Sequence, residues 1–218
     1  MLIDLSHVIH DGLMTYPGLP APRITPHLTR EQSRAVYAPG TEFAIDSIEM
    51  LGNTGTYLDA PFHRFADGDD LADLPLEGLV GLPASVLHMA PGAGRAVTAE
   101  LFDGLPIAGH AVLLHTGWDE HFGIPHYGAK APYLHPLACD LLVEQGAALV
   151  GIDSVNIDDT DSGGERPIHT RLLAAGIPIV EHLTGLQRLP ASGSRFTAVP
   201  PRIRGFGTFP VRAFAETP

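Results

Sequence analysis

The sequence predicts an α/β fold, built as a single domain over residues 1–218 with mixed β-sheets and flanking helices. Two apolar runs, 111–116 and 147–153, have the length and composition of fully buried strands. A predicted helix over 136–145 lies between them, and alternating strands and helices are typical of α/β proteins. The chain shows no internal repeat and no clean interdomain linker, and its 44% of apolar residues suffices for a sizeable core.

The N-terminal part is expected to consist of strands joined by long loops. Residues 1–9 form an opening strand or strand turn, and the Gly- and Pro-rich stretch 11–26 is a loop or an extended arm. The polar stretch 29–40 has the composition of a mobile lid. Residues 43–51 alternate apolar and polar side chains, which predicts a strand leading into the segment 52–63.

The C-terminal part is expected to alternate strands with short helices. A strand is centred on residues 84–88, and a short helix over 98–105 has Thr98 as its N-cap. A further helix begins at about Ile168 and is stopped by Gly176, and the apolar strand 177–180 follows it. The remaining chain through Phe214 resembles a hairpin.

Composition excludes several classes of function. The formal net charge is −12, from 13 basic and 25 acidic residues, and no basic run exists, so we expect no nucleic-acid partner. An acidic surface and the lack of about eighteen consecutive apolar residues predict no membrane partner. The N-terminus has an acid where a signal peptide needs cations, and a single cysteine, Cys139, excludes an intrachain disulfide. A cytoplasmic location is expected.

The segment 52–63 has the composition of a chemical site. Its two glycines and its proline favour a bent, extended backbone, and the bend could bring Asp59 and His63 to a common point. The alternative is a solvated loop in which Asp59 forms an Asx turn and His63 is incidental.

A second segment far along the chain strengthens the first interpretation. Glu181 follows the apolar strand 177–180, and His169 opens the helix before that strand. Ligands of open α/β sheets gather at the carboxyl ends of strands, although a surface carboxylate is the commoner role for such a residue. Asp59, Glu181 and one imidazole would balance a 2+ charge. Zinc, manganese and ferrous iron all accept such ligands.

The residues of these segments resemble the cyclase family that includes bacterial kynurenine formamidase and isatin hydrolase. The family pattern is His-x-Gly-Thr-His-x-Asp-x-Pro-x-His, and residues 53–63 lie on it with matches at Gly55, Thr56, Asp59, Pro61 and His63. The resemblance covers nearly the whole chain in the right order. Further matches are Asp4-Leu5-Ser6-His7, Tyr16-Pro17-Gly18, residues 115–118, 151–153, 169–183 and 205–212.

Two departures from the pattern concern the metal chemistry that the resemblance implies. Asn53 and Tyr57 stand where the family has its first two motif histidines, which hold one ion of a two-metal centre. The resemblance therefore implies one altered metal position and one retained site, with Asp59, His169 and Glu181 as ligands of a single Zn²⁺ or Mn²⁺. It also implies a layered, swivelling β/β/α fold, and His63 matches the catalytic acid/base.

Other residues are candidates for substrate contact or orientation. Tyr57 could donate a hydrogen bond to an oxyanion, as could a backbone amide of Gly55 or Thr56, or Tyr57 could act as a phenolate ligand. Tyr16, Phe43 and Trp118 could form an aromatic pocket, although a packing role for Trp118 is equally consistent with the sequence.

Two polar residues near strand ends have alternative roles. Asp153 closes a buried strand and either orients a ligand histidine or caps the following loop. His182 stands where the family has Asn, and it faces away from Glu181 if the strand continues.

The sequence thus predicts a metal-dependent hydrolase of an amide or a cyclic amide/ester, acting on C–N bonds other than peptide bonds. A metal-bound water would attack the carbonyl, with His63 as acid/base. The alternatives are a catalytically altered or inactive ligand-binding protein of the same fold, or a metal-dependent lyase or cyclase. We expect a small-molecule substrate and, by resemblance, a homodimer or homotetramer in which the arm at residues 16–26 reaches a neighbour.

Overall fold

The computed structural model describes residues 1–16, 18–90 and 92–218, and in this part of the chain nine strands form one mixed sheet. Four parallel strands make its centre. They are β5 (Leu82–His88), β7 (Ala111–His115), β9 (Leu149–Ile152) and β10 (Ile179–Glu181).

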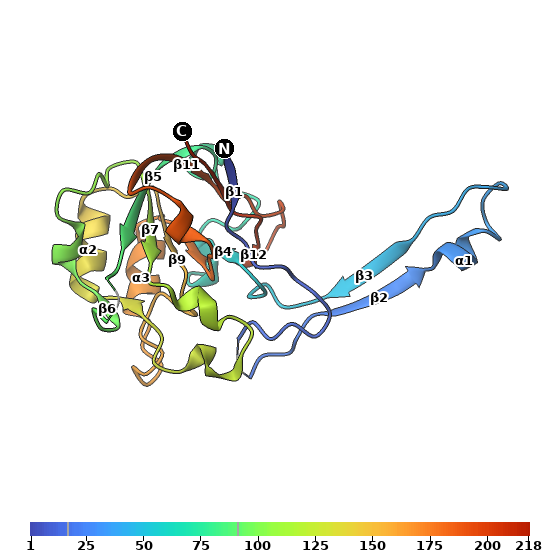
Figure 1. Ribbon diagram of the computed structural model, residues 1–218, viewed down its shortest axis with the longest axis horizontal. Coiled ribbons are helices and arrows are strands. Elements are labelled where there is room, and N and C mark those ends of the chain that lie inside the picture. Colours follow the sequence, from blue (N-terminus) through green and yellow to red (C-terminus); the bar gives the residue numbers. More distant parts are fainter. Residues whose placement is uncertain (17, 91) are drawn as a thin grey trace.

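Antiparallel strands extend the sheet at both ends. On one side, β4 (Tyr57–Asp59) lies between β10 and β12 (Thr208–Pro210). On the other side, β11 (Ser192–Thr197) pairs with β5, and β13 (Phe214–Glu216) joins it to β1 (Leu2–Asp4). The chain ends therefore lie close together (Figure 1).

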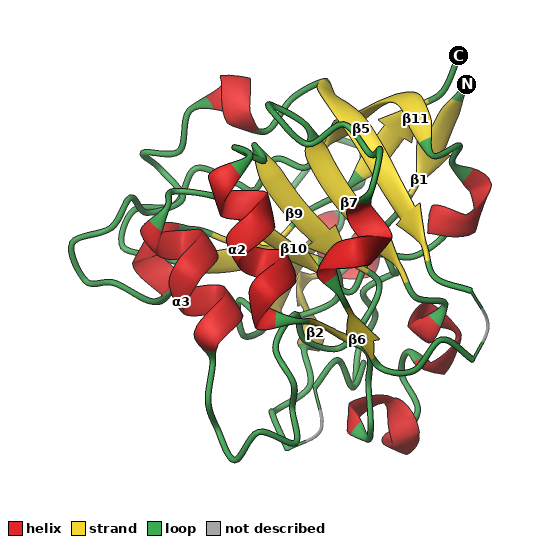
Figure 2. Cartoon of the chain, turned by 90° about the vertical axis from the view of Figure 1, so that its left-hand side faces the viewer, coloured by secondary structure: helices red, strands yellow, loops and turns green. Residues whose placement is uncertain are grey.

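Alternate residues of the central strands enter two apolar layers, as the two-residue period of a strand requires. Val112 and Val150 pack with α2 (Pro136–Glu144) and α3 (Pro167–Ala174), which cover one face of the sheet (Figure 2). Leu113 belongs to the layer on the opposite face. Burying each such side chain stabilises the fold by roughly 1.5–3 kcal/mol. Both predicted strands, 111–116 and 147–153, and the predicted helix between them are confirmed.

An arm leaves this body. Strands β2 (Arg23–Leu28) and β3 (Ile45–Glu49) form an antiparallel ribbon that extends away from the sheet, with α1 (Arg30–Ser33) near its far end (Figure 1). All residues of β3 are exposed, so the predicted strand exists but its apolar side chains do not enter the core. The predicted lid at residues 29–40 lies at the far end of the arm and does not cover the pocket described below.

Several local predictions are wrong or incomplete. The predicted helix over 98–105 is a 3₁₀ turn, Ala99–Phe102, and Thr98 makes no side-chain cap. The C-terminal region is not a hairpin, because β12 and β13 pair with strands at opposite ends of the sheet.

Smaller features complete the fold. A short parallel pair joins β6 (Ala96–Val97) and β8 (Tyr133–Leu134). The predicted turn at residues 16–18 includes Pro17, which lies outside the described residues. No helix in the described part of the chain is long and apolar enough to cross a bilayer.

Candidate active site

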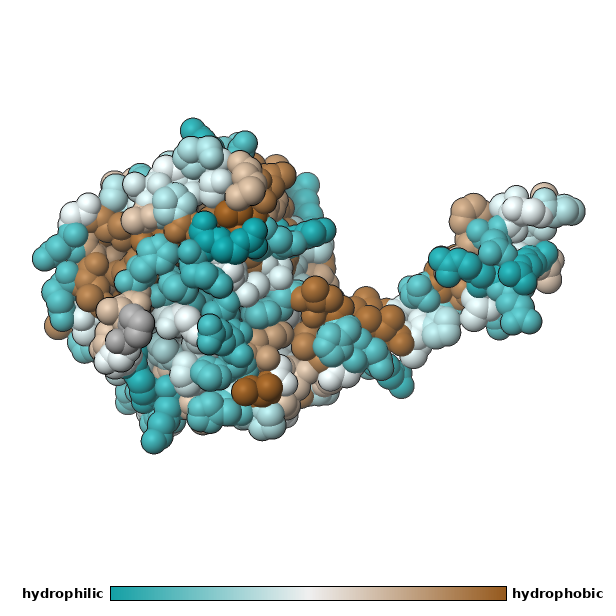
Figure 3. All heavy atoms as spheres, viewed as in Figure 1, coloured by the Kyte–Doolittle hydropathy of each residue, from teal (hydrophilic) through white to brown (hydrophobic). Residues whose placement is uncertain are grey.

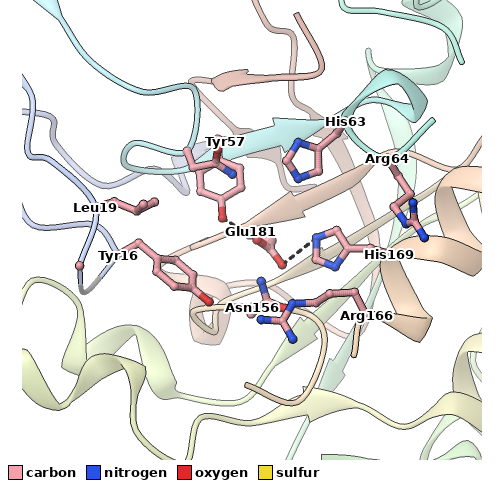
Figure 4. Close-up of a pocket in the computed structure, with 11 residues that line it drawn as sticks. Tyr16, Leu19, Tyr57, His63, Arg64, Asn156, Arg166, His169 and Glu181 are labelled. Atoms are coloured by element: carbon pink, nitrogen blue, oxygen red, sulfur yellow. Dashed lines mark hydrogen bonds and ion pairs between the residues drawn. The ribbon is translucent and has the colours of Figure 1, made fainter. Parts of the chain in front are cut away.

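A pocket of about 410 Å³ opens beside strands β4 and β10 and the start of α3 (Figure 4). Its volume lies within the range of small-molecule sites. The described residues that line it are Tyr16, Gly18, Leu19, Asn53, Tyr57, His63, Arg64, Asn156, Arg166, His169 and Glu181.

The register of the sheet places the polar groups at this pocket. Tyr57 of β4 lies opposite Glu181 of β10, and Asp59 lies opposite Thr208 of β12. Directly opposed residues share a face of the sheet, so their side chains meet. The Tyr57 hydroxyl donates to Glu181 Oε2 at 2.6 Å, and the Thr208 hydroxyl donates to Asp59 Oδ1 at 2.5 Å. The alternative of a solvated loop around Asp59 is wrong, because Asp59 is fully buried within a strand.

His63 follows β4 in a 3₁₀ turn, Pro61–His63, and remains partly exposed at the pocket. Its backbone packs against Gly207, where any Cβ would collide with the amide nitrogen and Cα of His63. His63 Nδ1 lies 2.6 Å from the Thr208 hydroxyl. The Thr208 proton goes to Asp59, so the Thr208 oxygen accepts from Nδ1–H of His63. Nε2 is the ring nitrogen left for the pocket.

His169 is fixed at the start of α3 by Asp158. One oxygen of this carboxylate accepts from the Ile168 amide at 2.7 Å, and the other accepts from the His169 amide at 3.1 Å and from His169 Nδ1 at 2.7 Å. Asp158 therefore does two things at once: it accepts from the free amides at the N-terminus of α3, and it orients the His169 imidazole. His169 Nε2 is left 3.6 Å from Asp59 Oδ2 and 3.6 Å from Glu181 Oε1.

Negative charge dominates this part of the pocket. Burial alone would lower the pKa of His169, but Glu181, Asp158 and Asp59 outweigh it and raise that pKa to about 10. Burial raises the pKa of Glu181 to about 7, against the opposing effect of the charge on His169. Without a cation at the site, the proton on His169 is the charge that balances the carboxylates.

These residues fit a divalent cation. Asp59 Oδ2 is buried and has no hydrogen-bond partner among the described residues, which is costly unless a ligand satisfies it. Ligand atoms of Asp59, His63 and His169 lie within 4.8 Å of one another. The sequence favours Glu181 over His63 as the third ligand. Glu181 Oε1 lies 3.6 Å from His169 Nε2. Asp59 and His169 thus belong to both candidate ligand sets.

Tyr57 and Asn53, which the resemblance places at the altered motif positions, lie on the other side of Glu181. The Tyr57 hydroxyl, besides donating to Glu181, lies 3.2 Å from His182 Nε2, and His182 Nδ1 lies 2.8 Å from the Tyr127 hydroxyl. Burial raises the pKa of Tyr57 well above its ordinary value and lowers the pKa of His182 to about 3. A protonated phenol is therefore favoured over the phenolate ligand considered for Tyr57. Asn53 lines the pocket nearby.

His182 does not continue the strand. Strand β10 ends at Glu181, and a φ of 56° at His182 places its ring beside Tyr57 instead of on the opposite face.

Of the three aromatic residues considered for substrate contact, only Tyr16 lines the pocket. Trp118 packs against Tyr127, to whose carbonyl its indole N–H donates at 2.8 Å. Phe43 is 53% exposed on the arm and contacts Tyr37.

Asp153 has a structural role, but it holds a different turn from the following loop that the sequence suggested. It accepts hydrogen bonds from the amides of Thr116 and Gly117 and holds the turn after β7. The carboxylate that orients His169 is Asp158, 11 residues earlier in the sequence, and sequence analysis missed it. Thr208 was also missed, because only the pairing of β12 with β4 brings it to Asp59. Arg166 was also missed. The available signal was its position directly before Pro167, the first residue of the helix that carries His169.

A mixed sheet that presents buried carboxylates and imidazoles to a small pocket defines a candidate metal-dependent enzyme centre. The Cyclase family model matches residues 3–159. The kynurenine formamidase of Paracidovorax citrulli is 30% identical over 223 residues, covering 100% of this chain and 97% of that protein. The kynurenine formamidase of Geobacillus thermodenitrificans is also 30% identical, with 97% and 95% covered. The chain belongs to the cyclase family.

Solved structures agree on the fold. Isatin hydrolase A from Labrenzia aggregata, bound to benzyl benzoate, superposes with a TM-score of 0.84 at 24% identity, covering 100% of this chain and 93% of that one. A structure described as a potential metal-dependent hydrolase with cyclase activity gives a TM-score of 0.80 at 25% identity, with 100% and 99% covered. The predicted fold class and the resemblance to the cyclase family are confirmed.

Proposed function

We propose that this protein is a metal-dependent hydrolase of an amide or a cyclic amide/ester, of the kind that an arylformamidase or an isatin hydrolase cleaves. The observation that carries the proposal is the buried, unpartnered Asp59 Oδ2 facing His169 Nε2 at the pocket. The relatives named as kynurenine formamidases support the choice of C–N bonds other than peptide bonds.

Asp59, His169 and Glu181 would hold one Zn²⁺ or Mn²⁺ ion. Such an ion, when bound, polarises a carbonyl and lowers the pKa of a water toward neutrality. Asp158 holds His169 with Nε2 directed at the two carboxylates, and the backbone amide of Ile157 fixes Glu181 Oε1 at 2.6 Å. All three ligands are thus positioned before an ion arrives, so little reorganisation accompanies binding.

His63 is the proposed acid/base. Its Nδ1 is committed to Thr208, which leaves Nε2 for proton transfer on a partly exposed ring at the pocket. That nitrogen can take a proton from water and return it to the leaving nitrogen, as suits an imidazole near neutral pH.

For Tyr57 the geometry supports a positioning role over the oxyanion role considered first. Its single hydroxyl proton is donated to Glu181, so it is not free for an oxyanion. The Gly55 amide is likewise used, since it donates to the Thr15 hydroxyl at 2.8 Å. We propose that Tyr57 orients Glu181 and that Asn53 contributes to the pocket wall.

Hydrolysis of formanilide and isatin by the metal-loaded protein tests this function. The expected products are formate with aniline, and the ring-opened acid of isatin, with neither reaction in a His169→Ala variant. Metal-dependent consumption of either substrate without these hydrolysis products would instead indicate a metal-dependent lyase or cyclase. Bound metal without any turnover would favour the ligand-binding alternative.

We also propose that the β2–β3 arm, whose first strand includes residues 23–26 of the expected 16–26 arm, joins copies of this chain into a homodimer or a homotetramer. An isolated two-stranded ribbon is marginally stable in water, and this one exposes Ile24, Phe43, Ile45 and Ile48. Hydrophobic surface gathers where the arm leaves the body (Figure 3). Light scattering that shows a monomer would refute this. We further propose a cytoplasmic location, which cell fractionation tests.

A further inference from the structure

Two arginines line the pocket, and the proposed reaction uses neither of them. They are Arg64 and Arg166. The ion pairs between arginine and carboxylate among the described residues include neither one. Within the described part of the chain, neither guanidinium is neutralised by a carboxylate at contact distance, although the chain carries a net charge of −12. Such a group is available to a ligand.

The two arginines differ in direction. Arg64 donates to the Thr170 hydroxyl at 3.2 Å, lies over the Phe65 ring and points away from the pocket centre (Figure 4). Arg166 lies three residues before His169, and its side chain runs beneath that imidazole toward Asn156 and Tyr16 (Figure 4). Arg166 is therefore the one placed to meet a substrate.

The groups around Arg166 leave donors free. Its Nη1 donates to the Glu165 carbonyl at 2.7 Å, which uses only part of a guanidinium with five N–H groups. The Asn156 oxygen accepts from the Asp158 amide at 3.0 Å, so the Asn156 side-chain NH₂ is turned the other way and can donate. The Tyr16 hydroxyl lies at the same wall. A guanidinium, an amide NH₂ and a phenol together suit a planar anion.

We infer that Arg166, with Asn156 and Tyr16, binds a carboxylate of the substrate, so that the preferred substrates are amides that also carry a carboxylate group. This inference rests on the proposed hydrolase function for its catalytic consequence. The alternative, that Arg166 only neutralises the metal-site carboxylates, places it in an ion pair with Asp59 or Glu181, and no such pair exists among the described residues.

A matched pair of substrates tests the specificity. Formanilide and 2-formamidobenzoate contain the same aryl formamide, and only the second has a carboxylate. The wild type is expected to prefer 2-formamidobenzoate. Arg166→Gln should lower kcat/KM for that substrate about 10–100-fold, mainly through KM, and change formanilide turnover less than about threefold. The control is Arg171→Gln, since Arg171 lies in α3, the helix that begins directly after Arg166, but pairs with Asp140 at 3.1 Å.

A binding experiment separates this inference from the hydrolase proposal. Benzoate and benzamide are titrated calorimetrically into the wild type, Arg166→Gln, Arg166→Lys and Arg171→Gln. Benzoate affinity should fall at least about tenfold in Arg166→Gln and less in Arg166→Lys, while benzamide is unaffected. The same result with no turnover of either formamide would support the carboxylate site and contradict the hydrolase. Turnover of both formamides without an effect of Arg166→Gln on either substrate, or on benzoate, would overturn the inference and leave the hydrolase standing.

Discussion

Strand β4 supplies one residue to each side of Glu181, Asp59 to one and Tyr57 to the other, yet the polar groups on the two sides are satisfied in opposite ways. On one side, Asp59 Oδ2 has no hydrogen-bond partner and His169 Nε2 stands 3.6 Å from two carboxylates, beyond hydrogen-bond range. On the other side, Tyr57 donates to Glu181 and also meets His182. Unpaired buried polar atoms are rare unless a ligand satisfies them. The difference indicates that a cation belongs on the first side and that the second side is a support.

The support is a chain of buried side chains. Tyr57 and His182 contact each other. Tyr127 continues the contact. These residues form a buried hydrogen-bonded chain that ends on Glu181.

The largest effect is expected at Asp59. Asp59→Ala should abolish both metal binding and turnover, since it removes the carboxylate oxygen that faces His169. Metal analysis of the purified protein and formanilide hydrolysis measure the two effects. Asp161→Asn is the control, because Asp161 is an exposed partner of Arg95 away from the pocket lining. Full activity in a metal-stripped Asp59→Ala protein would contradict the account.

His63→Gln distinguishes a ligand from an acid/base. As an acid/base, His63 should give a kcat loss of about 10²–10⁴-fold while the ion stays bound. Single-turnover and steady-state kinetics, with metal content on the same samples, make the measurement. Loss of the ion in His63→Gln and its retention in Glu181→Gln would assign His63, and not Glu181, as the third ligand.

Asp158→Asn weakens the first side without touching the ligands themselves. Because Asp158 accepts from His169 Nδ1, the variant should reduce metal affinity about 10–100-fold. Competition with a fluorescent chelator measures the affinity. The neighbouring Asp159→Asn, which loses only an ion pair to Arg95, should leave it unchanged. Equal losses in the two variants would remove the orienting role from Asp158.

The support on the second side makes the fold sensitive to acid. Burial lowers the pKa of His182 to about 3, below the 6.5 of an exposed histidine. As pH falls from 6.5 toward 3, the unfolded chain takes up a proton that the folded protein refuses. His182 should therefore cost up to about 1.4 kcal/mol of unfolding free energy per pH unit. Urea unfolding at pH 6.5 and pH 5 should show a smaller loss in His182→Asn than in the wild type, and equal losses would contradict this.

Composition and motifs predicted those strands, helices and site residues that are determined by neighbouring residues in the sequence. The buried strands at 111–116 and 147–153 and the helix between them follow from composition, and the motif located Asp59 and His63. Thr208 could not be found, because its role depends on the pairing of β12 with β4, 149 residues away from Asp59 in sequence. Phe43 belongs to a segment of alternating apolar and polar residues, which is typical of a strand that packs on a core. It is exposed because that segment lies on the arm, where no other described part of the chain covers its apolar face.

The most direct test of the central claim is the metal content of protein prepared without chelator, measured by plasma mass spectrometry on the wild type, His169→Ala and Tyr57→Phe. One ion per chain in the wild type, lost in His169→Ala and kept in Tyr57→Phe, is the predicted result. It would show that the side of Asp59 and His169 binds the ion and that the Tyr57 side supports it. No ion in any of the three, even after exposure to zinc or manganese, would contradict the account.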